Sequence, residues 1–442
     1  MKRKLNIFIL LFMAVISYAQ SNQFTTTLNY IYSKNCLNED CSKKGETIKY
    51  FDEFGRSKQI INIKATPLGK DIVTPIEYDE FGRNLKSYLP IPQNQTQNGA
   101  VYENPQNNAP QTYGSDIYYY GSATVESSPV GKMLSSKKPG ADYLGHSVTY
   151  EYETNGASDV KMYTIQTTWE NGATKDIITE SSYYAAGQLL KNSVTDEDGN
   201  ITTEFINGKG QIVMTRNSAT LKADTYYVYN KYNQLAAIIS PLASAQALNE
   251  TALDKLCYQY RYDSKGRQAE KKLPGKTWEY FVYDKQDRLV LSQNAALGTV
   301  TNNFAQKGWL FTKYDKFGRV AYTGFFASTA TRSAMQTDIN NMTVNPGNNE
   351  ERSTTPFTLN GMDIYYTNNA FPTGSMTALS VNYYDKYPPL PSNVTIPGQI
   401  LGQNVLAQDG SSSTKTLPTA TYTKNVENDS WTKDFIWYDS KG

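Results

Sequence analysis

The stretch Tyr262-Asp263-Ser264-Lys265-Gly266-Arg267 decides the fold, because its pattern, aromatic-Asp-x-x-Gly-Arg, recurs along much of the chain. In such a pattern the Asp side chain opens a type I turn by accepting hydrogen bonds from backbone amides ahead of it. The Gly then takes the following position of positive φ. β-favouring segments flank the turns, as from Trp278 to Tyr283 before one copy and from Arg319 to Tyr322 after another. Each copy is therefore predicted to be a β-hairpin.

The turn positions of this repeat are the principal structural candidates. They are Asp52, Gly55 and Arg56; Asp79, Gly82 and Arg83; Asp263, Gly266 and Arg267; Asp284 and Arg288; and Asp315, Gly318 and Arg319. The copy at Asp284 has Asp287 in place of Gly, and weaker copies run from Tyr229 to Gln234 and from Tyr184 to Gln188. Asn and Asp also tolerate the left-handed region of backbone conformation, so these substitutions preserve the expected turn.

Composition is that of a folded protein rich in β-structure. Hydrophobic residues make up 39% and charged residues 19% of the chain, which is too apolar and too weakly charged for a disordered polypeptide. There are 35 Tyr against 16 Phe, and a ring with a polar tip suits half-exposed strands. Because a lone hairpin is marginal in water, these hairpins need neighbours. The predicted fold class is all-β, with stacked antiparallel β-hairpins forming a spiral or shell after an amino-terminal β-rich region.

The first residues are typical of a secretory signal peptide. Three basic residues precede an apolar run from Leu5 to Ile16, and Ser17-Tyr18-Ala19 is a small-residue cleavage site. The apolar run is short for a membrane span, although a retained amino-terminal anchor is the alternative. We therefore expect a signal peptide over residues 1–19 and a secreted or cell-surface chain. Its basic and acidic residues nearly balance, which gives no electrostatic footprint for nucleic acid or an anionic membrane.

Composition along the chain suggests five segments. After the signal peptide we expect an amino-terminal β-rich domain over 20–160, a dense repeat region over 161–323, a polar loop or insertion over 324–360, and further hairpins over 361–442. Within them, the Gln/Asn/Pro-rich stretch from Pro92 to Gln111 predicts a long loop. The stretch from Ala243 to Leu256 is the best helix candidate.

The cysteines are too few to hold an exported chain of this length together. Cys36 and Cys41 are close enough in sequence to form a disulfide in an oxidising compartment, with free buried thiols as the alternative, whereas Cys257 has no partner nearby. A zinc site is not expected, because two cysteines and the single His146 leave a four-ligand set incomplete.

Residues able to do chemistry favour a structural role over catalysis. The prominent aspartates all occupy the same turn position, so no catalytic pair stands out. The segment from Asp196 to Asn200 lacks the ligand spacing of a calcium loop and fits a degenerate repeat turn. The sequence has no Gly-x-Ser-x-Gly motif with which His146 could form a catalytic triad. It also has no phosphate-binding or dinucleotide-binding motif. We expect no catalytic, metal or cofactor-binding residue, and we expect the repeated arginines to form ion pairs or stack on Tyr, with anionic glycan binding as the alternative.

These motifs resemble the YD repeats of bacterial Rhs proteins. Longer segments carry the resemblance to a secreted Rhs subfamily with an uncharacterised amino-terminal domain: Leu256 to Asp263 continuing through Glu270 to Lys276, Trp309 to Asp315, Ile72 to Asp79, and Pro139 to Tyr143. The resemblance covers residues 45–442. It implies a spiral β-shell, which in the family often encloses a variable carboxy-terminal toxin, while the related teneurins use such a shell for adhesion. No counterpart of the family's self-cleaving core or of a toxin module is recognised in this sequence.

Three classes of function follow from the repeats and the resemblance. The first is a non-catalytic secreted scaffold, the amino-terminal part of an Rhs-type shell whose partner is a carboxy-terminal core or toxin of the same protein. The second is a cell-surface adhesin that binds a surface glycan or protein, and the third, with least support, is a secreted carbohydrate-active enzyme. Because Trp437 to Gly442 stops one position before the motif's Arg, we also expect an incomplete shell with an unpaired edge.

Overall fold

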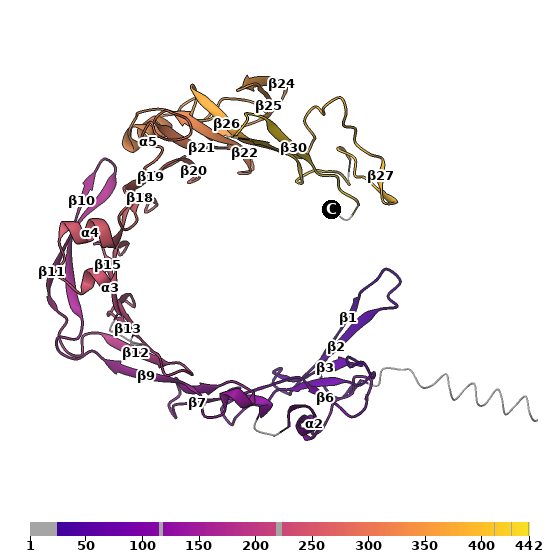
Figure 1. Ribbon diagram of the computed structural model, residues 1–442. Helices are drawn as coiled ribbons and strands as arrows, with labels where there is room; N and C mark the ends of the chain where they lie inside the picture. The colour runs from indigo at the N-terminus through magenta and orange to yellow at the C-terminus, as the bar shows by residue number, and fades with distance from the viewer. Residues whose placement is uncertain (1–23, 115–117, 218–222, 411, 426, 441) are drawn as a thin grey trace, which may run out of the picture. The chain divides into compact units, whose positions relative to one another are not determined.

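The computed structural model describes residues 24–114, 118–217, 223–410, 412–425, 427–440 and 442. It contains 44% strand and 8% helix, which confirms the predicted all-β class (Figure 1). The expected signal peptide, residues 1–19, lies outside the described residues. No helix in the described part of the chain is long and apolar enough to cross a membrane.

The chain forms two compact units whose segments alternate in sequence. One comprises Met1–Gly156 and Ala185–Ala223, and the other Ala157–Tyr184 and Asp224–Gly442. This division differs from the expected boundary at residue 160 and the single repeat region over 161–323. The cause is strand pairing. The strand at Leu190–Thr195 pairs directly with the strand at Val148–Thr154, and the hairpin between them in sequence, over Lys161–Tyr183, belongs to the other unit.

The first unit contains two antiparallel sheets. The strand order of one sheet is β1-β2-β3-β4-β6, and in the other β5, β7, β8, β9, β12, β13 and β14 pair in succession. The elements are β1 Tyr30–Cys36, β2 Lys44–Phe51, β3 Ser57–Ile63, β4 Ile72–Pro75, β5 Lys86–Tyr88, β6 Ile91–Pro92, η1 Pro105–Asn108, α2 Ala109–Tyr113, β7 Tyr120–Val125, β8 Met133–Lys137, η3 Ala141–Tyr143, β9 Val148–Thr154, β12 Leu190–Thr195, β13 Ile201–Ile206 and β14 Ile212–Asn217.

The polar stretch from Pro92 to Gln111 is a loop between Pro92 and Pro105, as its composition predicted, and ends in helical turns. It contains η1 and the start of α2, and a fully buried Asp71 fixes its backbone. The Asp71 carboxylate accepts hydrogen bonds from the Thr96 hydroxyl at 2.8 Å, the Gln97 amide at 3.0 Å and the Tyr102 hydroxyl at 3.0 Å. Buried backbone needs such partners, and composition alone does not show where they come from.

The second unit is a long antiparallel succession of hairpins. Strands β15 to β22 pair consecutively, and β26, β29 and β30 continue the sheet. The elements are β10 Lys161–Glu170, β11 Ala173–Tyr183, β15 Ala223–Tyr229, β16 Leu235–Ile239, α3 Pro241–Ser244, α4 Glu250–Leu256, β17 Cys257–Tyr262, β18 Gln268–Lys272, β19 Trp278–Tyr283, β20 Leu289–Gln293, β21 Gly308–Asp315, β22 Val320–Ala327, α5 Arg332–Asn340, β23 Asn349–Glu350, β24 Arg352–Leu359, β25 Met362–Tyr366, β26 Met376–Tyr384, β27 Gln399–Ile400, β28 Gln403–Asn404, β29 Pro418–Lys424 and β30 Trp431–Phe435.

Register and packing in this unit follow from the repeat. The pairing shifts by one residue at the repeat Tyr, as between Val282 and Tyr283 and between Lys313 and Tyr314, which is a β-bulge at the mouth of the turn. On the buried face, Trp309 and Phe311 of β21 belong to the main apolar core. The predicted strand at Trp278–Tyr283 is confirmed residue for residue.

Two expectations for this unit need correction. The polar segment 324–360 is not one loop, because it contains α5, β23, β24 and the end of β22. Helix α5 buries Met335 and Ile339 in the core, and Arg332 is buried through an ion pair with Glu270 at 3.0 Å. The expected helix over 243–256 is instead the short helices α3 and α4, since Asn249 is the N-cap that begins α4.

Candidate functional site

The repeated turns are the most regular chemical feature of the molecule. In the copy at Asp263, the Gly266 amide donates to the Asp263 carbonyl at 2.9 Å, and the Asp263 amide donates to the Arg267 carbonyl at 2.9 Å. The Asp263 carboxylate accepts from the amides of Lys265 and Arg267, and from Arg267 Nε at 2.7 Å. Gly266 has a φ of +80°, a conformation that residues with a Cβ rarely adopt. The Asp therefore closes the turn on its backbone and binds the Arg of its own repeat.

The same geometry recurs at the other sequence-predicted turns. The Arg Nε to Asp Oδ2 distance is 2.7 Å in every one of the pairs Asp52–Arg56, Asp79–Arg83, Asp284–Arg288 and Asp315–Arg319. Gly55, Gly82 and Gly318 have φ between +76° and +78°, and Asp287 takes this position with a φ of +62°. The pairs differ in burial. The Asp284 side chain is 1% exposed, whereas that of Asp52 is 21% exposed.

In four of these five copies the Arg also reaches the next repeat, whereas Arg83 lies over Phe81 of its own repeat. The Arg267 guanidinium lies over the Tyr283 ring at 4.7 Å, and the Tyr283 hydroxyl donates to the carbonyl of Gln268, the residue after that Arg, at 2.9 Å. We call this pair of contacts the inter-repeat clamp. Cation–π stacking and a hydrogen bond thus join one hairpin to the following one.

The inter-repeat clamp occurs in both units. Its Arg–Tyr pairs, with their ring distances, are Arg56–Tyr78 at 4.4 Å, Arg267–Tyr283 at 4.7 Å, Arg288–Tyr314 at 4.7 Å and Arg319–Tyr384 at 4.4 Å. In the same order, the Tyr hydroxyls donate to the carbonyls of Ser57, Gln268, Leu289 and Val320 at 3.1, 2.9, 2.7 and 3.2 Å. Tyr262 keeps the hydrogen bond to Leu235 at 2.8 Å although the preceding repeat has Gln234 in place of Arg.

Sequence reasoning missed two turns of this kind. Asn207 replaces Asp in one of them, where it accepts from the amides of Lys209 and Gln211 while Gly210 has a φ of +77°. The signal for it was the Asn-x-x-Gly spacing, without the aromatic residue and the Arg. The segment from Asp196 to Asn200, expected to be a degenerate turn, has the same hydrogen bonds, with Asn200 in the place of Arg.

The second missed turn is interrupted by a long insertion. Asp385 donates its amide to the carbonyl of Leu417 at 3.0 Å, and its carboxylate accepts from the Thr416 amide at 2.7 Å, where Thr416 has a φ of +72°. Tyr438 then donates to Pro418 at 2.6 Å, as a repeat Tyr does. The Asp385 carboxylate binds Arg319 at 3.2 and 2.7 Å, and these hydrogen bonds hold the pKa of Asp385 below its ordinary value.

The remaining sequence candidates lie apart from these turns. Cys36 and Cys41 form a disulfide at the tip of the β1–β2 hairpin, and Cys257 is a buried free thiol. His146 is exposed, with Nδ1 3.0 Å from the carbonyl of Glu197. Within the described ranges, no group of three or more His, Cys, Asp or Glu side chains is placed to hold a metal ion.

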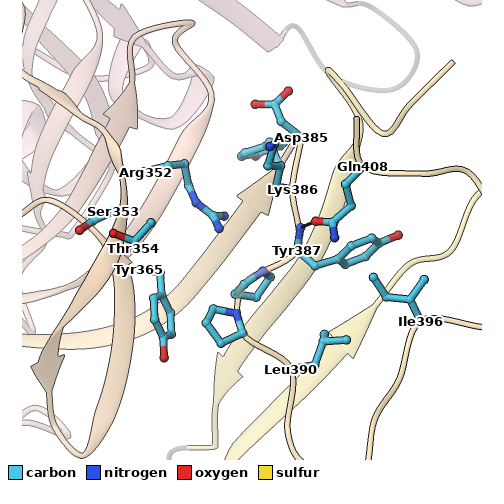
Figure 2. Close-up of a pocket in the computed structure, with 13 residues that line it drawn as sticks. Arg352, Ser353, Thr354, Tyr365, Asp385, Lys386, Tyr387, Leu390, Ile396 and Gln408 are labelled. Atoms are coloured by element: carbon cyan, nitrogen blue, oxygen red, sulfur yellow. Dashed lines mark hydrogen bonds between the residues drawn. The ribbon is translucent and has the colours of Figure 1, made fainter. Parts of the chain in front are cut away.

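A pocket of about 660 Å³ opens beside the interrupted turn (Figure 2). Tyr365, Tyr387 and Leu390 give it apolar walls, and Figure 2 shows Arg352 on the side of Tyr365, across from Tyr387 and Leu390. Tyr387 is fixed in place, because its amide donates to Gln408 at 2.8 Å and its hydroxyl to the Ile436 carbonyl at 2.6 Å. Among the described residues that line this pocket, Asp385 is the one carboxylate. The arrangement suits stacking against a planar or sugar ring better than paired acid–base chemistry.

Comparison with known proteins gives a partial match. Residues 23–155 match the model of a domain of unknown function, DUF6443, which covers less than a third of the chain. No curated protein matches the sequence.

Several solved structures align at low identity. The crystal structure of TcdB2-TccC3 without its hypervariable C-terminal region aligns with a TM-score of 0.44 and 10% identity over 93% of this chain and 20% of that one. TcdB2-TccC3-TEV aligns with a TM-score of 0.43 and 13% identity over 69% of this chain and 14% of that one. TcdB2-TccC3 aligns with a TM-score of 0.42 and 11% identity over 91% of this chain and 21% of that one. The chain thus spans about a fifth or less of these proteins, and at such scores the likeness adds nothing to the fold described above.

Proposed function

We propose that this chain is a non-catalytic structural scaffold, the amino-terminal part of an exported Rhs-type shell that carries or encloses a carboxy-terminal toxin or effector. The inter-repeat clamp is the observation that carries the proposal. It engages the repeat's Arg and Tyr in holding one hairpin to the next, so the most repeated polar groups serve the architecture.

The hydrogen bonds of the repeat Arg and Asp side chains also argue against glycan binding or catalysis by these residues. Arg288, for example, donates to Asp284 and to the carbonyls of Gly347 and Asn348, so little of its hydrogen-bonding capacity remains for an anionic ligand. Asp284 is 1% exposed and bound by that Arg, which suits a structural carboxylate better than an acid–base catalyst.

Adhesion through a surface glycan is the second candidate. The pocket in Figure 2 favours it, because rigid aromatic rings beside an Arg side chain are a suitable surface for a sugar. A carbohydrate-active enzyme is a weaker use of the same pocket, since Asp385 has no second carboxylate beside it among the lining residues and is bound to Arg319.

The scaffold proposal is tested on the natural protein, captured from culture with an antibody against the second unit. We expect a mature chain that begins at Gln20, a polypeptide that continues past Gly442, and a carboxy-terminal part that resists protease until the shell is unfolded. A protease-sensitive extension, or a natural chain ending at Gly442, would contradict the carrier role. Binding to a glycan array that a Tyr387→Ala variant loses would favour the adhesin, and glycan hydrolysis by the wild-type chain would favour the enzyme.

A further inference from the structure

A fully buried lysine lies in the core of the second unit, in the same strand as the clamp residue Tyr314. Lys313 occupies an inward position of β21, two residues after Phe311, and its side chain is 0% exposed. An ammonium group in such a place loses its hydration, and burial lowers the pKa of Lys313. A buried lysine with a lowered pKa can present a neutral, nucleophilic amine.

Two side chains from separate segments converge on this amine. Lys313 Nζ lies 3.0 Å from Glu350 Oε1, and Glu350 is also 0% exposed. The same nitrogen lies 2.7 Å from Oδ1 of Asn368, which follows β25. The Lys313 amine is therefore within hydrogen-bond distance of both a carboxylate and a carboxamide.

A hydroxyl group lies close to the carboxamide, with the Glu350 carboxylate and, at 3.1 Å, the Thr367 carbonyl as its other acceptors. The Tyr322 hydroxyl lies 3.2 Å from Asn368 Oδ1 and 2.9 Å from Glu350 Oε1. Tyr322 is fully buried, and its neighbours Phe311 and Tyr366 form apolar walls around the group. Once Glu350 is protonated, this hydroxyl can donate to the amide oxygen instead, and a donor placed there stabilises negative charge on that oxygen.

The remaining donors fix Glu350 in position. They are the Thr367 hydroxyl at 2.6 Å, the Asn369 amide at 3.0 Å and the Ala370 amide at 3.0 Å. All three belong to the segment that carries Asn368. The Glu350 carboxylate is thus held by the same turn that carries the Asn368 side-chain amide. A reaction between groups of one chain is fast only when the groups are held in position in this way.

We propose that Lys313 and Asn368 are joined by an intramolecular amide bond, formed by the chain itself with Glu350 as the general base. Glu350 takes a proton from the Lys313 ammonium, and the Nζ electron pair attacks the side-chain carbonyl carbon of Asn368. Negative charge on Oδ1 is stabilised by the Tyr322 hydroxyl. Glu350 then delivers its proton to Nδ2, and the bond from the carbonyl carbon to Nδ2 breaks so that ammonia leaves. Nζ gives its second proton to the carboxylate of Glu350 as the new amide forms. No oxidant or cofactor is needed, because one amide is exchanged for another.

Such a bond would tie β21 to the turn after β25, across the β24–β25 hairpin that is inserted beside the main sheet. It goes beyond the proposed scaffold function and does not depend on it. A covalent crosslink between segments 55 residues apart restricts the unfolded chain, which is useful to an exported protein that is otherwise poor in crosslinks.

Mass spectrometry of the folded full-length chain tests the proposal. We expect an intact mass lower than the encoded mass by one ammonia. Cyclisation of an amino-terminal Gln also loses ammonia, so tryptic mapping after denaturation must locate the loss. Trypsin should fail to cut after Lys313, and peptide Gly308–Lys316 should appear linked to Ser353–Lys386.

Two variants separate this bond from other changes. Asn368→Ala should restore cleavage after Lys313 and abolish the linked peptide. Asn369→Ala, which changes an exposed neighbouring side chain and keeps its backbone amide, should leave the linked peptide intact. Complete tryptic cleavage after Lys313 in the folded wild-type protein, with the two peptides at their separate masses, would overturn the proposal.

Discussion

Replacing Arg288 with Ala tests the structural role of the repeat arginines where burial is greatest. The Arg288 side chain is 12% and the Asp284 side chain 1% exposed, and the guanidinium contacts the carboxylate at 2.6 Å through one terminal nitrogen and at 2.7 Å through Nε. Removing one partner of a buried ion pair typically costs about 3–5 kcal/mol. Asp284 keeps its hydrogen bonds from the amides of residues 286 and 288, so we expect about 3 kcal/mol, the low end of that range.

The assay is urea unfolding followed by tryptophan fluorescence. All five Trp residues lie in the second unit, so this signal reports the unit that contains Arg288. Lys265→Ala is the matched control, because Lys265 pairs with Asp287 at 2.8 Å in the same unit but both side chains are more than half exposed. An exposed pair is worth about 0–1 kcal/mol. If Arg288→Ala destabilises the unit no more than Lys265→Ala does, the structural reading of the repeat arginines is wrong.

Three further predictions concern single sites. Gly266→Val should destabilise the second unit by about 1–3 kcal/mol, because a β-branched residue is forced to a φ near +80°, whereas Gly266→Asn should be tolerated as Asn233 is at +61° in another repeat; thermal melting compares them. Burial raises the pKa of Asp176 in the folded protein above its unfolded value of about 4. The folded state is therefore more stable when Asp176 is protonated, and this stability is lost as the pH rises through the folded pKa. Asp176→Asn should therefore gain stability relative to wild type on going from acid to neutral pH, and urea titrations across that range should show no such gain if the group titrates normally. Reduction of the Cys36–Cys41 disulfide should raise hydrogen exchange only in β1 and β2, since so short a loop constrains the unfolded chain by about 2 kcal/mol; loss of the tryptophan signal would contradict a local effect.

The hairpins were predictable because the decisive interactions are local. Asp263 binds amides two and four residues ahead, and Gly266 follows it within the same turn, so spacing alone indicates the geometry. The turn at Asn207 was missed because Asn and Gln replace Asp and Arg while the hydrogen bonds stay the same. The turn at Asp385 was missed because Leu417 takes the place of Arg only after a long insertion.

The motif indicated that its Arg forms ion pairs or stacks on Tyr, but it could not indicate which residue of another repeat is the partner. Arg319 finds its second carboxylate 66 residues away at Asp385, and nothing in the local sequence identifies that partner. Helix α5 escaped notice for a similar reason. Few of its side chains are apolar, and its burial depends on contacts such as that of Arg332 with Glu270, which belongs to β18. The Lys313 site likewise depends on contacts among β21, β23 and the turn after β25, which are far apart in the sequence.

A double-mutant cycle between Arg267 and Tyr283 tests the central claim, that the repeated residues hold one hairpin to the next. The cycle compares Arg267→Ala, Tyr283→Leu and the double variant by urea unfolding of the second unit. Stacking at 4.7 Å in a partly buried site predicts a coupling free energy of about 1–2 kcal/mol, so the double variant should lose less stability than the sum of the single losses. Losses that add within about 0.3–0.5 kcal/mol would show that the two side chains stabilise their own hairpins independently, and would contradict the inter-repeat clamp.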